Sequence, residues 1–188
     1  MKIRALAALA LLCVGVSACS SSVARPDIVT ALANPNQKLG VVDVTCTAAA
    51  DVKMDAATLD RIKGGILLEL QHAKPASLMA KTNPDARPVS LKVNFTAYDE
   101  GSAVARLMLI GLGQIHIDGD IAIVDASGNT IGVYKIAKQF AIGGMIGGTT
   151  RIEDVEKGFE NSVVELVRDP SKASASSTQE KKKNLRPL

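Results

Sequence analysis

Three polar residues at alternate positions are the first candidates for metal chemistry. His116, Asp118 and Asp120 share one predicted strand, and alternate residues of a strand point to the same face about 6.6 Å apart. Imidazole and carboxylate groups bind divalent metals, but one strand cannot complete a coordination sphere without ligands from elsewhere. We therefore treat these residues as weak metal candidates and expect no metal. The pattern favours a solvent-facing strand in which Asp120 pairs with Lys135.

A glycine-rich segment is the second candidate for chemistry. Gly143–Gly148 precedes a predicted helix start, where backbone N–H groups and the helix dipole favour an anion. Its spacing resembles a phosphate-binding loop, but Thr149 stands where that loop has its lysine. The pair Gly111 and Gly113 is followed by His116 where a dinucleotide loop has glycine. Neither pattern predicts a nucleotide, so we expect a connection between a strand and a helix.

Apolar residues surround both glycine segments, over 107–112 and 140–146. They form either part of the core or an exposed patch for a partner or a membrane. Core burial is favoured, because a small domain needs this apolar area.

The inventory of nucleophiles and bases argues against an enzyme. The chain has only two histidines, His72 and His116, and no G-x-S-x-G sequence. Cys46 is the one cysteine beyond residue 19, and its β-branched, apolar surroundings predict a buried, inert thiol. Catalysis needs a nucleophile with a base or paired acids in a cleft. We predict a protein that is not an enzyme and needs no cofactor.

The N-terminus has the pattern of a signal peptide over residues 1–18. Lys2 and Arg4 precede the apolar run Ala5–Val16, whose helical length of about 18 Å is too short to span a bilayer. The sequence Val-Ser-Ala-Cys that ends at Cys19 resembles the bacterial lipobox. That resemblance implies diacylglyceryl transfer to Cys19 and cleavage between Ala18 and Cys19. The alternative is an ordinary secretory leader beside an incidental cysteine.

Lipidation of Cys19 predicts attachment to a membrane, because two or three acyl chains give stable anchoring. Ser20 after the lipidated cysteine indicates the outer membrane, facing the periplasm, in a Gram-negative cell. In a Gram-positive cell, the outer face of the cytoplasmic membrane is expected.

The charge distribution excludes a nucleic-acid-binding domain. The chain has 22 basic and 19 acidic residues, but the basic excess belongs to the leader and to residues 168–188. Acidic residues outnumber basic ones between them, whereas nucleic-acid binding needs clustered lysine and arginine. We divide the mature chain into a flexible spacer over 19–37, which could extend about 60 Å, a domain over 38–168 and a disordered basic tail over 169–188.

Hydrophobic periodicity within the domain predicts two helices and four strands. A strand over 38–46 precedes a helix that is capped by Asp55 and contains Gly64 and Gly65, which we expect to allow close packing on the sheet. The next strand alternates over 89–98, with the apolar residues from Val89 to Ala97 on the buried face and the polar residues and Tyr98 on the other face. A last helix should open with a capping box at Thr150 and Glu153 and bury one stripe of residues, Ile152, Val155, Phe159, Val163 and Leu166.

The segments on either side of residues 125–130 predict a hairpin. If Ser127 and Gly128 are the central turn residues, Gly128 needs a positive φ. The register then places three pairs of residues opposite each other: Asp120 and Lys135, Ile121 and Tyr134, and Ile117 and Lys138. The whole pattern is β-α-β-β-β-α, an α+β two-layer sandwich with helices on one face of a single sheet. An extra strand over 103–110 is the alternative.

The segment 106–130 resembles a family of small uncharacterised bacterial lipoproteins. It contains Arg106, then a G-x-G sequence at Gly111, an alternating strand, and a D-x-x-G turn from Asp125 to Gly128. The resemblance covers about residues 38–167 and implies a domain of unknown function that usually follows a lipobox.

These observations predict a non-enzymatic interaction or binding module, held at the membrane by the lipid on Cys19. An envelope protein is the expected partner, and no nucleic acid is expected. The alternative is a subunit of an oligomeric envelope transport or secretion assembly in which the segment 143–148 packs between protomers.

Overall fold

A computed structural model describes residues 24–108, 113–140 and 150–175. The described helices and strands are, in chain order, β1 (Asp27–Thr30), β2 (Leu39–Ala48), α1 (Ala56–Gln71), η2 (Ala80–Thr82), β3 (Arg87–Asp99), α2 (Ala103–Met108), β4 (Ile115–Asp125), β5 (Thr130–Phe140), α4 (Ile152–Arg168), η3 (Pro170–Lys172) and β6 (Ser174–Ala175).

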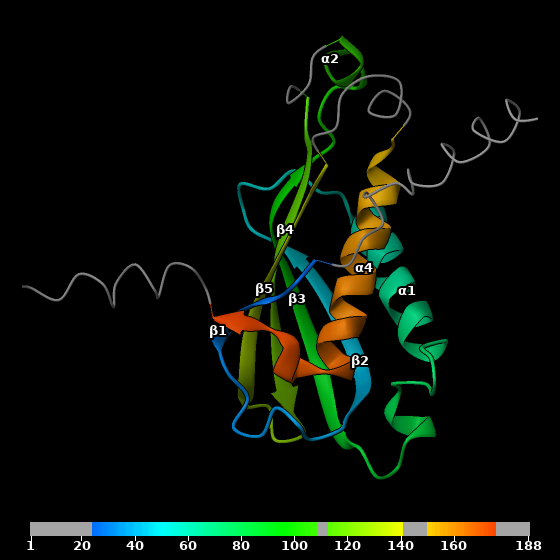
Figure 1. Cartoon of the computed structure of the whole chain (residues 1–188), viewed down its shortest axis with the longest axis vertical. Coiled ribbons are helices and arrows are strands. Elements are labelled where there is room, and N and C mark those ends of the chain that lie inside the picture. Colours follow the sequence, from blue (N-terminus) through cyan, green and yellow to red (C-terminus); the bar gives the residue numbers. More distant parts are fainter. Residues whose placement is uncertain (1–23, 109–112, 141–149, 176–188) are drawn as a thin grey trace, which may run out of the picture.

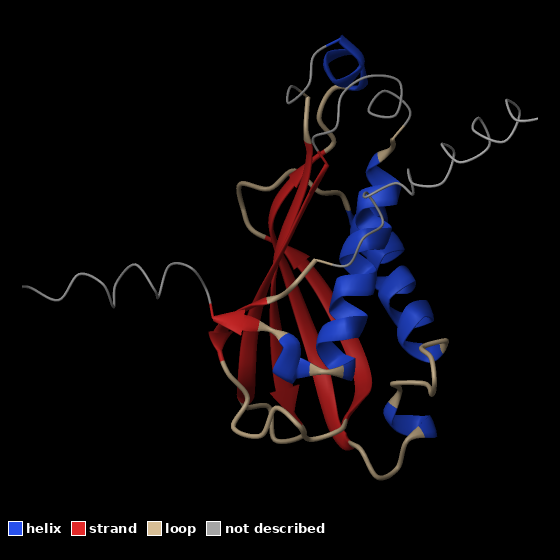
Figure 2. Cartoon of the chain, in the orientation of Figure 1, coloured by secondary structure: helices blue, strands red, loops and turns tan. Residues whose placement is uncertain are grey.

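One mixed sheet forms the first layer, with the strand order β2-β3-β4-β5-β1-β6. The neighbours β2 and β3 are parallel and joined by a crossover through α1, and β3, β4 and β5 are antiparallel. Helices α1 and α4 lie together on one face of the sheet (Figures 1 and 2). The predicted two-layer α+β sandwich is confirmed, and the predicted β-α-β-β-β-α elements occur in that order with β1, α2 and β6 in addition. The alternative of an extra strand over 103–110 is wrong, because residues 103–108 form helix α2. Of the helices in the described part of the chain, none has the length and apolar character that crossing a bilayer requires.

The core lies between the sheet and the two helices. The predicted stripe of α4 is buried at Val155, Phe159, Val163 and Leu166. The rings of Phe95 and Phe159 pack with their centroids 5.2 Å apart. Gly119 makes this contact possible, because a Cβ atom there would lie 2.8 Å from Phe159 Cζ.

A bulge in β3 changes the face to which its last side chains point. The register between β3 and β4 shifts between Phe95 and Ala97. Continuous alternation would place Tyr98 on the solvent face, and that expectation is wrong. Because the bulge adds one residue, Tyr98 lies opposite Ile117 and points to the helix-covered face.

The β4–β5 hairpin has the predicted register, although its turn differs from the expected one. Asp120 lies opposite Lys135, and Ile121 opposite Tyr134. The Gly128 N–H donates to the Asp125 carbonyl at 3.0 Å, so the central residues of the turn precede Gly128. A second irregularity, between Ile123 and Val124, restores the expected pairing. The predicted positive φ of Gly128 is confirmed at +85°.

The start of α4 differs from the prediction by one residue. The helix begins after Arg151, whose N–H donates to the Asp154 carboxylate at 2.9 Å. The capping box expected at Thr150 and Glu153 is therefore wrong. Asp154 is the third residue of the helix, and its carboxylate accepts the N-cap hydrogen bond that Glu153 was expected to accept.

The described residues on either side of the predicted domain, 24–37 and 169–175, belong to the fold, contrary to expectation. Strand β1 lies within the predicted spacer and pairs with β5, and β6 lies within the predicted tail and pairs with β1. The Ala24 N–H donates to Ser162 Oγ on α4 at 2.7 Å. Sheet pairing outweighs the turn-forming composition here, because the edge of β5 offers backbone partners.

We expect Gly128→Val to lower the free energy of unfolding by about 1–3 kcal/mol, since a β-branched residue resists positive φ. A Cβ atom at this position has no neighbour within 4 Å, so the loss would come from the backbone alone. Urea unfolding measures it. Ala126→Val, in the same turn at negative φ, is the control and should change stability little. Equal effects of the two changes would contradict the turn assignment.

Candidate functional site

The three weak metal candidates lie together on the face of the sheet that carries no helix. His116 Nε2 is 2.7 Å from Asp118 Oδ1, and Lys135 Nζ is 3.6 Å from Asp118 Oδ2. The predicted pair of Asp120 with Lys135 has the right register, but the lysine reaches diagonally to Asp118. The described residues contain no group of three or more His, Cys, Asp or Glu side chains placed to hold a metal. Asp118 is thus a partner of two basic groups.

Other sites predicted from the sequence lie partly outside the described residues. Ala18, Cys19 and the segment 143–148 are among these, as are most of the residues in the two apolar segments. Phe140, which begins the second of these segments, is buried in the core. Cys46 is only half-buried, contrary to the expected full burial, and this burial raises the thiol pKa to about 11. The thiol therefore stays protonated at neutral pH, as an inert cysteine would.

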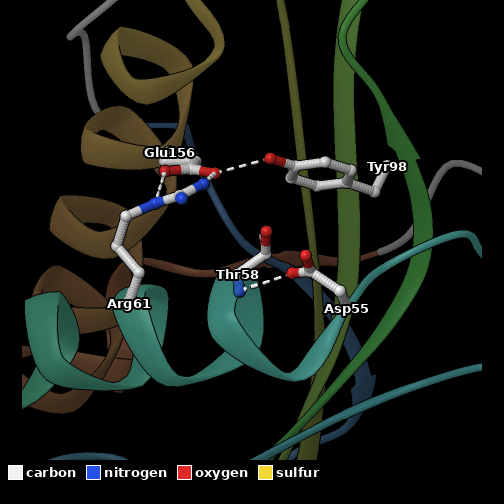
Figure 3. Close-up of polar contacts among 5 residues, drawn as sticks. All are labelled: Asp55, Thr58, Arg61, Tyr98 and Glu156. Atoms are coloured by element: carbon white, nitrogen blue, oxygen red, sulfur yellow. Dashed lines mark hydrogen bonds and ion pairs between the residues drawn. The ribbon is translucent and has the colours of Figure 1, made fainter.

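A polar cluster that the sequence analysis missed joins both helices to the sheet (Figure 3). The Arg61 guanidinium of α1 forms two hydrogen bonds with the Glu156 carboxylate of α4, Nε to Oε2 at 3.1 Å and Nη2 to Oε1 at 2.7 Å. The Tyr98 hydroxyl of β3 donates to Glu156 Oε1 at 2.7 Å. Nearby, Asp55 caps α1 by accepting from the Thr58 N–H at 2.7 Å. We call Arg61, Tyr98 and Glu156 the carboxylate cluster.

The Glu156 carboxylate is buried and accepts hydrogen bonds from both other members of the cluster. Its side chain is only 4% exposed, whereas that of Arg61 is 48% exposed. The hydrogen bond to Glu156 is the main cause that raises the pKa of Arg61. Burial is the main cause that raises the pKa of Tyr98. Both partners therefore remain protonated donors, so the cluster connects three elements and offers no free base.

A second set of charges continues along the contact between α1 and α4. Lys157 Nζ lies 2.5 Å from Glu69 Oε1 and 3.4 Å from Glu160 Oε2. A Cβ atom on Gly65 would clash with the Glu160 carboxylate, while one on Gly64 would meet open space. The two glycines were expected to allow packing on the sheet. Gly65 instead makes room for a carboxylate of the neighbouring helix.

The Glu160 carboxyl, on the same helix as Glu156, has a raised pKa. Burial is the largest cause of this rise, the neighbouring acids Glu156 and Glu69 add to it, and Lys157 opposes it. Ionising Glu160 therefore costs more in the folded than in the unfolded chain. Its stabilising contribution is complete below the unfolded pKa and is lost as the pH rises through the folded pKa.

A pocket of about 400 Å³ lies at the other end of α4, away from the carboxylate cluster. It is mainly apolar and lies between the docked N-terminal segment and the end of the helix, lined by Ala24, Arg25, Pro26, Glu165, Leu166, Asp169, Lys172 and Ala173. The sequence analysis could not predict this pocket, because it assigned residues 24–26 to a flexible spacer. The pocket forms only when these residues are docked against α4.

The geometry defines a small two-layer α+β domain whose buried acids are held by neighbouring donors. The chain belongs to the family of the domain of unknown function DUF4410, whose profile matches residues 37–144. Comparison with curated proteins gives no match.

Two similar solved structures are PelC dodecamers from Paraburkholderia phytofirmans, one of them a point variant. The variant is 11% identical with a TM-score of 0.49, and the alignment covers 79% of this chain and 99% of that one. The other is 12% identical with the same TM-score, and the alignment covers 79% and 96%. Similarity this low carries no conclusion about function.

We expect Gly64→Ala and Gly65→Ala to have opposite effects on stability. Alanine favours a helix over glycine by about 0.5–1 kcal/mol, so Gly64→Ala should stabilise the protein. Gly65→Ala should destabilise it, because the buried Glu160 carboxylate must shift and would lose part of its contact with Lys157. Urea unfolding measures both. Adding Glu160→Ala to Gly65→Ala should recover much of that loss, and no recovery would contradict the assigned clash.

We expect Glu160→Gln to stabilise the protein more at about pH 7 than at about pH 3.5, relative to the wild type, because only the ionised wild-type side chain opposes folding. Denaturant unfolding at both pH values measures the difference. Asp55→Asn is a control of opposite sign, since its hydrogen bond from Thr58 lowers the pKa of Asp55. The same sign for both variants would contradict the assignment.

Proposed function

We propose that this protein is a non-enzymatic interaction module, anchored to a membrane by a lipid on Cys19. In a Gram-negative cell the domain would face the periplasm from the outer membrane. The sequence Val-Ser-Ala-Cys at residues 16–19 supports the anchor. Membership in a family of unknown function is compatible with this proposal and does not specify a partner.

The observation that carries the proposal is the docking of the chain close to Cys19. Ala24 is hydrogen-bonded to Ser162, and β1 starts at Asp27. Only five peptide units separate Cys19 from Ala24, so the anchor and the docked chain can be at most about 18 Å apart. A flexible spacer would have allowed about 60 Å. The proposed anchor would therefore hold one end of the domain at the membrane surface.

The way in which the polar groups pair supports a binding rather than a catalytic role. Glu156 accepts from Arg61 and Tyr98, and Asp118 lies between His116 and Lys135. A general base needs a free lone pair within reach of substrate. Turnover of a substrate that His116→Ala abolishes would contradict the non-enzymatic part of the proposal.

An oligomeric envelope subunit is the second candidate, and the edge position of β2 favours it. Strand β2 ends the sheet, and Val42 on this strand is 56% exposed. An edge strand can pair with another copy. The bulge between Val41 and Asp43 and the charge of Asp43 oppose such pairing, so we prefer the first candidate. Light scattering that finds a monomer at micromolar concentration would exclude the second.

We expect Cys19→Ala to leave the protein uncleaved or free of the membrane, because no thiol remains to accept the diacylglyceryl group. Globomycin should likewise cause the uncleaved precursor of the wild type to accumulate. Membrane fractionation followed by mass spectrometry of the N-terminus measures both effects.

Cys46→Ala is the matched control and should leave anchoring unchanged. Wild-type protein that washes freely from membranes, or a mature N-terminus without acyl groups, would contradict the proposal.

A further inference from the structure

We infer that the pocket beside Ala24 binds a single acyl chain that carries an anionic head group. The pocket stands on its own geometry, but the membrane as the source of this ligand rests on the proposed function. The ligand class follows from the pocket walls, from the charges at the rim and from the distance to Cys19.

The pocket is built by hydrogen bonds that fix the N-terminal segment against α4. The Ala24 N–H donates to Ser162 Oγ at 2.7 Å, and that hydroxyl donates to the Gly158 carbonyl at 2.7 Å. Arg25 Nε donates to the Lys172 carbonyl at 2.9 Å. These bonds hold both walls in place, so the pocket is preformed.

The walls of the pocket suit an apolar chain. Ala24, Pro26, Leu166 and Ala173 form its apolar part. The volume of about 400 Å³ falls within the range of about 300–1,000 Å³ that is usual for small-molecule sites. Burial of each CH₂ group is favourable, so the apolar walls would add affinity for an acyl chain.

The charges at the rim favour an anionic head group. Both acids have basic partners, Glu165 with Arg168, and Asp169 with Lys172 at 3.2 Å. Among the ion pairs that the described residues form, none involves Arg25. Its hydrogen bond through Nε goes to a neutral carbonyl, and a guanidinium fork binds carboxylate or phosphate well.

The position of the pocket suits a ligand supplied by a membrane. Ala24 lines it and lies no more than about 18 Å from Cys19 along the chain. If Cys19 is lipidated, the rim is therefore close to lipid head groups. A fatty acid or a lysophospholipid combines a single acyl chain with a head of the required charge.

The test is calorimetric titration of the mature chain, from residue 19 with Cys19→Ala, with laurate below its critical micelle concentration. We expect one site per chain and a negative heat-capacity change, as burial of apolar surface requires. Dodecyl maltoside, with the same chain length and a neutral head, should bind at least tenfold more weakly.

Substitutions at the rim and inside the pocket test the assignment. Arg25→Ala should weaken laurate binding by roughly tenfold or more. Ala24→Phe should abolish it, and Ala173→Leu is a second filling variant should the first fail to fold. Arg151→Ala is the matched control, because this arginine is exposed at the opposite end of α4, and it should leave binding unchanged.

Absence of laurate binding by the folded chain would overturn the inference. Binding that survives both filling variants, or that is equal for the neutral and anionic probes, would overturn it as well. None of these results bears on the anchor, because fractionation of the Cys19 variants tests that separately.

Discussion

The docking of residues 24–30 onto the domain is the constraint on which both the short link to Cys19 and the pocket beside Ala24 depend. The Ala24 N–H bonds to Ser162 on α4, and β1 fills the edge of β5. These contacts bring the N-terminal part of the chain to the end of a helix instead of leaving it as a free tether. They limit how far the domain can lie from the proposed lipid on Cys19, and they form one wall of the pocket beside Ala24. Without them there would be neither a short tether nor a pocket.

The position of α4 has an electrostatic origin as well as an apolar one. Phe159 and its neighbours pack on the sheet, while Glu156, Lys157 and Glu160 face α1. Burying Glu156 is tolerable because Arg61 and Tyr98 supply donors. The Glu160 carboxylate lies in the space that the missing side chain of Gly65 leaves open. Contacts of both carboxylates therefore contribute to how α1 and α4 lie against each other. Ser162 and the pocket beside Ala24 lie further along α4.

Features with a local signal were predictable from the sequence, and features that depend on distant partners were not. The apolar stripe of α4, the Asp55 cap and the hairpin register follow from periodicity and turn chemistry. Tyr98 was misassigned because one bulge residue reverses the alternation. The Arg61–Glu156 contact spans 95 positions in the chain, so no short pattern records it. Strand β1 has only four residues and becomes a strand by pairing with β5.

Hydrogen exchange of residues 24–32 in the mature chain tests the docked segment most directly. The structure predicts that the Ala24 amide and the amides of β1 exchange far more slowly than in an unstructured peptide, because they are bonded to Ser162 and β5. Ser162→Ala should speed the exchange of Ala24 while the amides of β4 stay protected. Exchange of the whole segment at the rate of a free peptide, with β4 still protected, would mean a flexible spacer and would contradict both the short tether and the pocket.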